Sequence, residues 1–150
     1  MLPIFTDTNQ LPQQPAAQPI DYVKSRPDVN PSRVAVTGNS CGGLLTLMVG
    51  VERKGLKALV ILAPAEVGRN FSRTFFRVSS LDAPVLLLVE VSDGSEYQNN
   101  FDALDRALRE QNKQVNSIRY DRGGGHDLFH SVRYYLEDIK AFLHEKLDGK

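Results

Sequence analysis

Short apolar runs that alternate with helix-like segments constrain the fold more than any other feature of this sequence. Four segments are predicted to be strands, and the runs at 58–62 and 84–89 contain little but Ala, Val, Ile and Leu, with one Pro. Strands that are apolar along their length and alternate with helices form parallel sheets covered on both faces. The sequence therefore predicts a three-layer α/β/α fold with about four recognisable strands, at 33–37, 58–62, 84–89 and 115–120.

The segments between these runs predict helices. A short helix over 20–26 is stopped by Pro27, and an apolar helix over 44–51 ends near Gly55. The stretch 66–80 indicates only a short helix with loops. Two further helices are recognised by their apolar faces: one capped by Asn99 or Asn100 with Phe101, Leu104, Ala107 and Leu108, and a final one with Val132, Leu136, Ile139, Leu143 and Leu147.

Composition divides the chain in two and excludes several functions. Residues 1–19, rich in Pro and Gln, are expected to form a loosely packed arm, and 20–150 a single domain. The 18 basic and 18 acidic residues give no net charge, so nucleic acid and anionic membranes are not expected partners. No apolar stretch is long enough to span a membrane, and no signal peptide is recognised. The single cysteine precludes an internal disulfide, which favours a cytoplasmic location.

The first strand is followed by Gly38-Asn-Ser40-Cys41-Gly42, a Gly-x-Ser-x-Gly motif that opens a helix. In this context a serine sits on a tight turn that exposes its Oγ, and we expect crowding to exclude side chains at both glycines. Ser40 is therefore the predicted nucleophile. Cys41 is a rival, but the glycines flank Ser40 symmetrically, and the predicted role of Cys41 is to offer its backbone N–H to an oxyanion.

The third strand is followed by Asp93, which is the predicted acid of a catalytic triad. An acid at this position can reach back to orient a histidine. Asp is also a common residue in turns, so a purely structural role is the alternative. Glu90 and Glu96, in the same stretch, are competitors for the role of the acid.

The fourth strand leads into Gly123-Gly-Gly-His126, and His126 is the predicted general base. A histidine in a glycine-rich loop at a strand end can turn into a site, and the order Ser, Asp, His matches that of α/β-hydrolases. His130 is the next candidate, whereas His144 lies on the last helix and is expected to face solvent. No metal or cofactor is predicted.

Arginines recur at every fourth position after the second strand, at 69, 73 and 77. If this stretch is helical, the three side chains share one face near the mouth of the site. Arg73, the central one, is the candidate for binding a substrate carboxylate. A solvated basic face is the alternative interpretation.

Three segments together resemble the dienelactone hydrolase family of the α/β-hydrolase superfamily: residues 26–43 around the serine motif, 83–93 and 122–129. The resemblance spans residues 20–147 and implies a metal-free hydrolase of carboxylic esters or lactones. Such an enzyme acts through an acyl-enzyme formed on its nucleophile. Members in the strict sense carry cysteine as nucleophile. The matching position here is Ser40, as in esterase and peptidase relatives.

The stretch before the nucleophile departs from the family pattern. Only 39 residues precede Ser40, and neither the early strands nor a His-Gly-Gly loop with a second oxyanion donor is recognised there. The sequence therefore leaves two hypotheses open. The protein is either an ester hydrolase with a low turnover rate, or a half-domain that needs a partner chain or serves as an interaction module. An uncovered strand at 33–37 would template pairing with another chain, which predicts a homo-oligomer.

Overall fold

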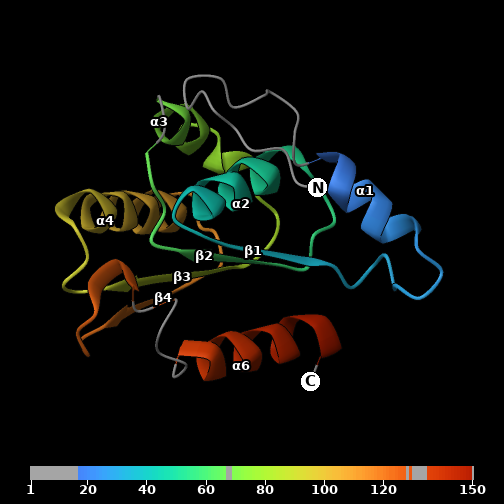
Figure 1. The fold of residues 1–150 in the computed structure, drawn as a ribbon. Helices are drawn as coiled ribbons and strands as arrows, with labels where there is room; N and C mark the ends of the chain where they lie inside the picture. Colours follow the sequence, from blue (N-terminus) through green and yellow to red (C-terminus); the bar gives the residue numbers. More distant parts are fainter. Residues whose placement is uncertain (1–16, 67–68, 128, 130–134, 150) are drawn as a thin grey trace.

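The computed structural model describes residues 17–66, 69–127, 129 and 135–149, and it confirms the predicted three-layer α/β fold (Figure 1). Within these described residues, four parallel strands form one sheet in the order β1-β2-β3-β4. The strands are β1 (Ala35–Asn39), β2 (Ala58–Leu62), β3 (Val85–Glu90) and β4 (Val115–Tyr120). The helices are α1 (Ala17–Ser25), α2 (Cys41–Glu52), α3 (Asn70–Phe75), α4 (Ser95–Glu110) and α6 (Tyr135–Asp148), with short 3-10 turns η1 (Val78–Ser80) and η2 (Gly125–Asp127).

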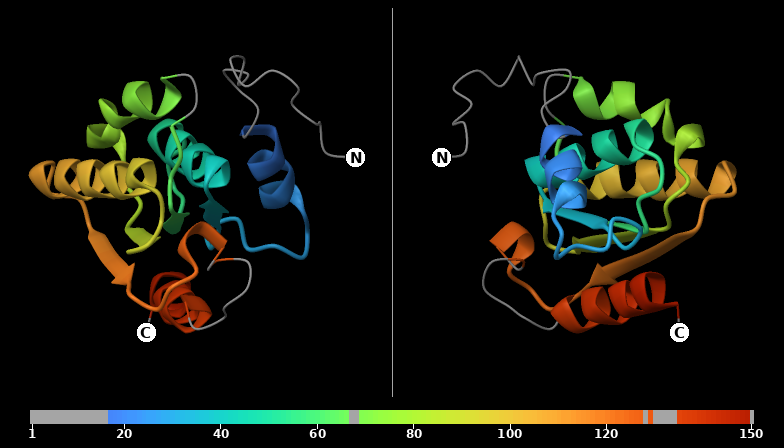
Figure 2. Two further views of the ribbon diagram at one scale, coloured as in Figure 1. Left: turned by 60° about the vertical axis from the view of Figure 1, so that its left-hand side comes forward. Right: turned by 90° about the vertical axis from the view of Figure 1, so that its right-hand side faces the viewer.

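The helices lie on both faces of the sheet. Figures 1 and 2 show α2 and α4 against one face, with α3 beyond them, and α6 against the other. The α1 helix lies beside α2, where Arg53 Nη2 is 3.0 Å from Asp21 Oδ2. None of the helices in the described part of the chain is both long and apolar enough to cross a membrane.

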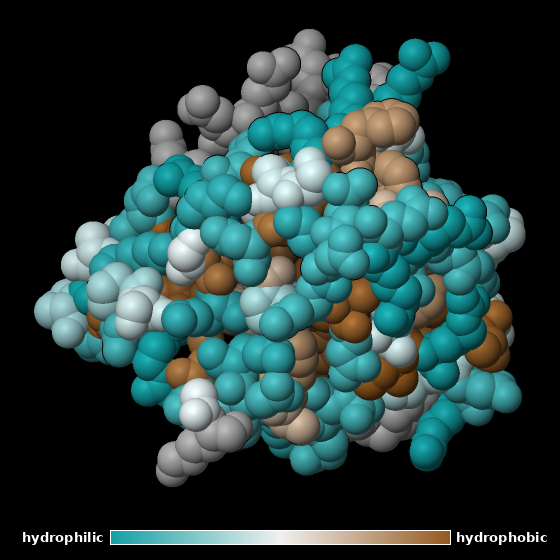
Figure 3. Space-filling view, turned by 180° about the vertical axis from the view of Figure 1, so that it is seen from behind, coloured by the Kyte–Doolittle hydropathy of each residue, from teal (hydrophilic) through white to brown (hydrophobic). Residues whose placement is uncertain are grey.

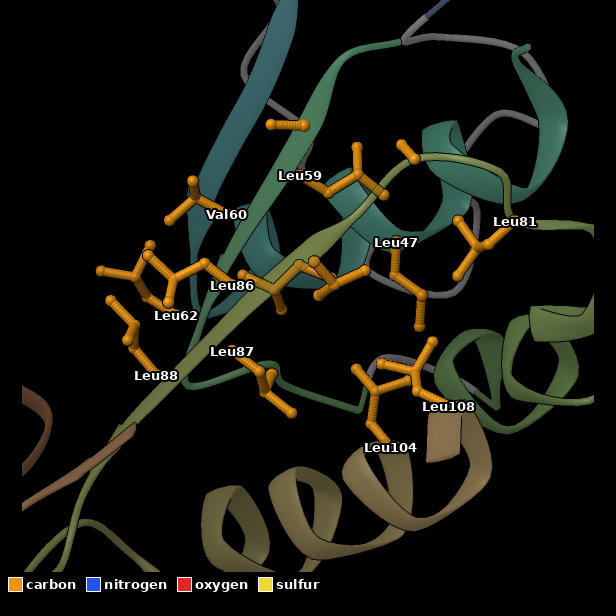
Figure 4. Packing of buried hydrophobic residues seen from close by; sticks show 14 of the residues in the cluster. Leu47, Leu59, Val60, Leu62, Leu81, Leu86, Leu87, Leu88, Leu104 and Leu108 are labelled. Carbon is orange, nitrogen blue, oxygen red and sulfur yellow. The ribbon is translucent and has the colours of Figure 1, made fainter. Parts of the chain in front are cut away.

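The two central strands form the core because every residue of β2 and β3 is buried. Successive side chains of a strand point to opposite faces. In Figure 4, Leu87 lies on the side of Leu104 and Leu108 from α4, whereas Leu62 and Leu88 lie on the other side of the strands. The continuous apolar runs read from the sequence therefore fill both interfaces of the three-layer fold. Burial of apolar surface is the dominant favourable contribution to folding, at about 25 cal/mol per Å² removed from water.

Several predicted boundaries differ from the structure, among them those of β1 and α4. The first strand runs to Asn39, two residues beyond the predicted end. The prediction that α4 begins at Asn99 or Asn100 is wrong: the helix begins at Ser95, where the Gly94 carbonyl accepts hydrogen bonds from the N–H groups of residues 97 and 98. The Asn100 side chain instead donates a hydrogen bond to the Pro64 carbonyl at 2.9 Å. Asn100 therefore makes a tertiary contact and does not cap the helix.

The last helix keeps its predicted place, although its described part starts at Tyr135. Val132, the first residue of the predicted apolar face, lies outside the described residues. Phe142 is the buried residue of this helix, and Ile139 and Leu143 are half-buried against the core.

Close approach of α2 to the strands explains why glycine is needed at the turn, at one of the two predicted positions and at one that was not predicted. A Cβ on Gly38 would lie 2.1 Å from the Gly42 carbonyl oxygen, and a Cβ on Gly43 would lie 2.8 Å from the Leu62 carbonyl oxygen. A Cβ on Gly42 would meet no atom within 4 Å. The expectation that crowding excludes a side chain at Gly42 is therefore wrong, because that position faces open space, and Gly43 is the crowded one.

These two neighbouring glycines predict opposite outcomes for the same substitution. Gly43→Ala should lower the free energy of unfolding by about 1–3 kcal/mol, because the Leu62 carbonyl cannot move aside without disturbing β2. Gly42→Ala should leave it unchanged or raise it by up to about 1 kcal/mol, since alanine favours a helix. Urea denaturation of the two variants measures both values, and equal stabilities would contradict the packing argument.

The strand β1 lies at one edge of the sheet formed by the described strands. Figure 3 shows hydrophobic residues at several separate places between hydrophilic ones on the rear face of the molecule. The central residue of β1, Thr37, is itself exposed. An exposed edge of this kind can pair with a second chain.

Self-association therefore remains a prediction for this protein. Size-exclusion chromatography with light scattering should give the mass of an oligomer at micromolar concentration. Thr37→Lys should shift the mass toward the monomer, because a charge on an edge strand opposes pairing between chains. A monomeric mass for the unaltered chain would refute the prediction.

Candidate active site

Ser40 occupies the turn between β1 and α2 in a backbone conformation that residues other than glycine rarely adopt, with φ 57° and ψ −119°. Three backbone hydrogen bonds hold the turn: Ser40 N–H donates to Leu62 O at 3.0 Å, and Ser40 O accepts from Leu44 N–H at 3.1 Å and Ala65 N–H at 3.2 Å. A strained residue that the surroundings fix so firmly points to a functional position.

The Ser40 side chain does not serve the helix that it precedes. A serine at the start of a helix ordinarily accepts a hydrogen bond from the helix N–H groups, but Ser40 makes no side-chain capping bond to α2. Cys41 is the first residue of α2, and its side chain is exposed. The first N–H groups of a helix have no partner within the helix, so the Cys41 N–H can serve an anion beside Ser40.

Asp93 and His126 lie within hydrogen-bond distance although 33 residues separate them. His126 Nδ1 lies 3.1 Å from Asp93 Oδ2, and the second oxygen of the carboxylate accepts the Gly94 N–H at 2.9 Å. The Asp93 side chain is 1 % exposed and that of His126 is 29 % exposed. With Nδ1–H donated to the carboxylate, Nε2 is the nitrogen that is left to accept a proton.

Tyr97 completes the surroundings of the histidine, and the sequence pattern did not single it out. Its ring stacks on that of His126 with centroids 4.2 Å apart and an interplanar angle of 22°. Tyr97 lies in the first turn of α4, so the helix that starts earlier than predicted brings this ring to the site. The stacked ring limits rotation of the imidazole about its side-chain bonds.

The other candidate residues lie elsewhere. The Glu96 carboxylate accepts the Glu66 N–H at 3.1 Å, so it supports the segment after β2. His144 faces solvent as predicted, with a side chain 78 % exposed and Nδ1 2.9 Å from Asp148 Oδ2. His130 lies outside the described residues.

Glu90, the second competitor for the acid, is fully buried and has a different set of partners. Its carboxylate accepts hydrogen bonds from the backbone of the acid loop, residues 91–94, and of the histidine loop, residues 121–127. Burial raises the pKa of Glu90, but the hydrogen bonds from Ser92, Gly123 and Arg122 outweigh it, so that the pKa lies below its usual value. Ionised Glu90 therefore stabilises the fold above the ordinary carboxyl pKa, and this contribution is lost as the pH falls through the lower folded-state value.

The three arginines do not lie on one helix, so the condition under which they would share a face is not met. The α3 helix covers only Asn70–Phe75; Arg69 precedes it with a φ of 69°, and Arg77 follows it. Arg77 Nη1 instead pairs with Glu52 Oε1 at 3.4 Å. Arg73 is exposed near the end of α3, and its binding of a substrate carboxylate stays a prediction.

The fold brings the predicted nucleophile, acid and base to the same end of the sheet. Ser40 follows β1, Asp93 follows β3 and His126 follows β4, at the left-hand end of the sheet in Figure 1. No hydrogen bond joins Ser40 to His126 among the described residues, and contacts of this kind often tighten only when substrate is bound. Within the same residues no group of three or more His, Cys, Asp or Glu side chains has the arrangement of a metal site.

Comparisons with solved structures agree with this fold. An acylaminoacyl peptidase from Pyrococcus horikoshii superposes with a TM-score of 0.72 at 19 % identity, over 85 % of this chain and 26 % of the peptidase. A dienelactone hydrolase described as putative, from Klebsiella pneumoniae, gives 0.63 at 23 % identity over 82 % and 55 % of the two chains. An acetyl xylan esterase from Paenibacillus sp. R4 gives 0.68 at 19 % identity over 87 % and 50 %.

The chain thus spans between about a quarter and about half the length of these proteins. The search of curated proteins found no match. The model of the dienelactone hydrolase family, however, matches residues 3–140, which include all three residues of the candidate triad. The chain belongs to the dienelactone hydrolase family.

Proposed function

We propose that this protein is a serine hydrolase that cleaves carboxylic esters or lactones through an acyl-enzyme. The observation that carries the proposal is the buried Asp93 carboxylate 3.1 Å from Nδ1 of His126, at the sheet end where Ser40 is held in a strained turn. Membership of a hydrolase family supports it independently.

The chemistry follows from the roles of the three side chains. Ser40 Oγ attacks the acyl carbon while Nε2 of His126 takes the hydroxyl proton. His126 then gives that proton to the leaving alcohol oxygen as the ester bond breaks. Water attacks the acyl-enzyme in the second half of the reaction, and His126 accepts its proton and returns a proton to Ser40.

Two further groups assist these steps. Asp93 accepts Nδ1–H, which holds the imidazole in the tautomer that can act as base and stabilises the imidazolium formed during attack. The Cys41 N–H, at the start of α2, stabilises the negative charge that develops on the acyl oxygen. Arg73 is proposed to attract substrates that carry a carboxylate, because its guanidinium is exposed on α3.

The choice between the two possible nucleophiles is tested by covalent labelling. A fluorophosphonate probe should label the unaltered protein and Cys41→Ala, but not Ser40→Ala, because the probe reacts with an activated serine. Mass spectrometry of the labelled peptide identifies the modified residue. Label that persists in Ser40→Ala would show that the serine assignment is wrong.

The roles of Asp93 and His126 are tested by turnover of p-nitrophenyl acetate. His126→Gln should lower kcat by at least about 10³-fold, and Asp93→Asn by about 10³- to 10⁴-fold, because the base or its tautomer is lost. His144→Gln is the matched control, since His144 also pairs with a carboxylate through Nδ1 but lies on the exposed face of α6.

That control should retain the unaltered rate. Equal rates in all three variants would refute the assignment of the pair. A parallel assay with a lactone and a peptide p-nitroanilide separates ester and lactone hydrolysis from peptidase activity, and faster cleavage of the anilide would contradict the proposed substrate class.

A further inference from the structure

The Glu90 carboxylate accepts five hydrogen bonds from the described residues, and these five donors belong to the two loops that carry Asp93 and His126. Oε1 accepts the N–H groups of Arg122 and Gly123 at 3.2 and 3.0 Å. Oε2 accepts the Ser92 N–H at 2.7 Å, the Gly125 N–H at 3.1 Å and the Ser92 hydroxyl. We call this set of bonds the Glu90 clamp.

The clamp binds the residue directly before each member of the Asp93–His126 pair. Ser92 immediately precedes Asp93, and Gly125 immediately precedes His126. The two loops are also packed closely here, since a Cβ on Gly125 would lie 3.1 Å from the Ser92 carbonyl oxygen. A shift of the clamped backbone would therefore be passed directly to the two side chains whose distance sets the Asp93–His126 hydrogen bond.

The histidine loop needs such a constraint because of its composition. Gly123, Gly124 and Gly125 have φ values of 77°, 98° and 52°, which residues with a Cβ rarely adopt. Three consecutive glycines lose much conformational freedom on folding, and they offer no side chains for packing. The hydrogen bonds from the Gly123 and Gly125 N–H groups to a buried carboxylate help to offset this entropic cost.

A charged carboxylate suits this position better than any neutral side chain of the same size. All five partners are donors, and a carboxylate has acceptor sites on both oxygens. A glutamine amide would direct its NH₂ group toward N–H donors in either orientation. One orientation would lose the bonds from the Arg122 and Gly123 N–H groups, and the other would lose those from the Ser92 and Gly125 N–H groups.

We propose that Glu90 is a positioning residue whose clamp holds the histidine loop against the acid loop and thereby fixes His126 at hydrogen-bond distance from Asp93. The catalytic consequence rests on the proposed function, whereas the clamp itself does not. Loss of the clamp should reduce the fraction of molecules with a productive Asp93–His126 pair, which lowers kcat and leaves KM almost unchanged.

The test compares Glu90→Gln with Asp105→Asn. Asp105 is a matched control because it is a part-buried carboxylate that accepts hydrogen bonds from Arg109 and Ser117, and those bonds lower its pKa against the opposing effect of burial. Within the described part of the chain, its carboxylate makes no hydrogen bond to either loop. Two readouts are taken from each protein: amide hydrogen exchange of Arg122, Gly123 and Gly125 by NMR, and kcat and KM for p-nitrophenyl acetate.

Glu90→Gln should speed exchange at these amides by at least about tenfold and lower kcat by about 10- to 100-fold. Asp105→Asn should change neither the exchange rates nor kcat, even where it lowers Tm as much as Glu90→Gln does. Ser92→Ala, which removes one donor of the five, should give intermediate values and serves if Glu90→Gln does not fold. In the His126→Gln background, Glu90→Gln should cause no further loss of kcat, since the clamp acts through His126.

Unchanged exchange of the histidine loop in Glu90→Gln would overturn the proposal, as would an equal loss of kcat in Asp105→Asn. A full additional loss of kcat in the His126→Gln background would also overturn it. If the unaltered protein proves inactive, the proposed function fails, and the exchange rates still decide whether Glu90 clamps the two loops.

Discussion

The parallel register of the four strands is the constraint on which the candidate site depends. Asn39 is level with Leu62, Leu62 with Leu88, and Glu90 with Tyr120. The hydrogen-bonded ladder continues past the strand ends, where Ser40 N–H donates to Leu62 O and Val91 N–H to Tyr120 O. The register of these backbone bonds therefore brings residues distant in sequence to one end of the sheet.

Close packing around this sheet end determines the backbone conformations that the site uses. Gly38 and Gly43 allow α2 to approach the strands, and the bonds from Ser40 to Leu62 and Ala65 hold the strained turn. Glu90 does the corresponding work for the histidine loop with a buried charge. The turn that carries Ser40 thus depends on the small size of glycine, and the loop that carries His126 depends on the number of hydrogen-bond acceptors that a carboxylate offers.

The family match and the geometry of the Asp93–His126 pair are independent observations that support the same proposed function. The family model matches residues 3–140, and the solved structures share the fold at identities below 25 %. The Asp93–His126 pair is a property of this chain's own side chains. Ser40 stands where the strict members of the resembled family carry cysteine, and Cys41 beside it remains exposed at the start of α2.

The sequence by itself determined the order of strands and helices, the parallel three-layer fold and the candidate residues at the strand ends. Hydrophobic periodicity and glycine-rich turns are local signals, so they can be read along the chain. Only the tertiary structure decided that Gly43 is crowded and Gly42 is not, that Tyr97 stacks on His126, and that Glu90 joins two loops. These features depend on contacts between segments about 20 to 35 residues apart, whose distances no local pattern encodes.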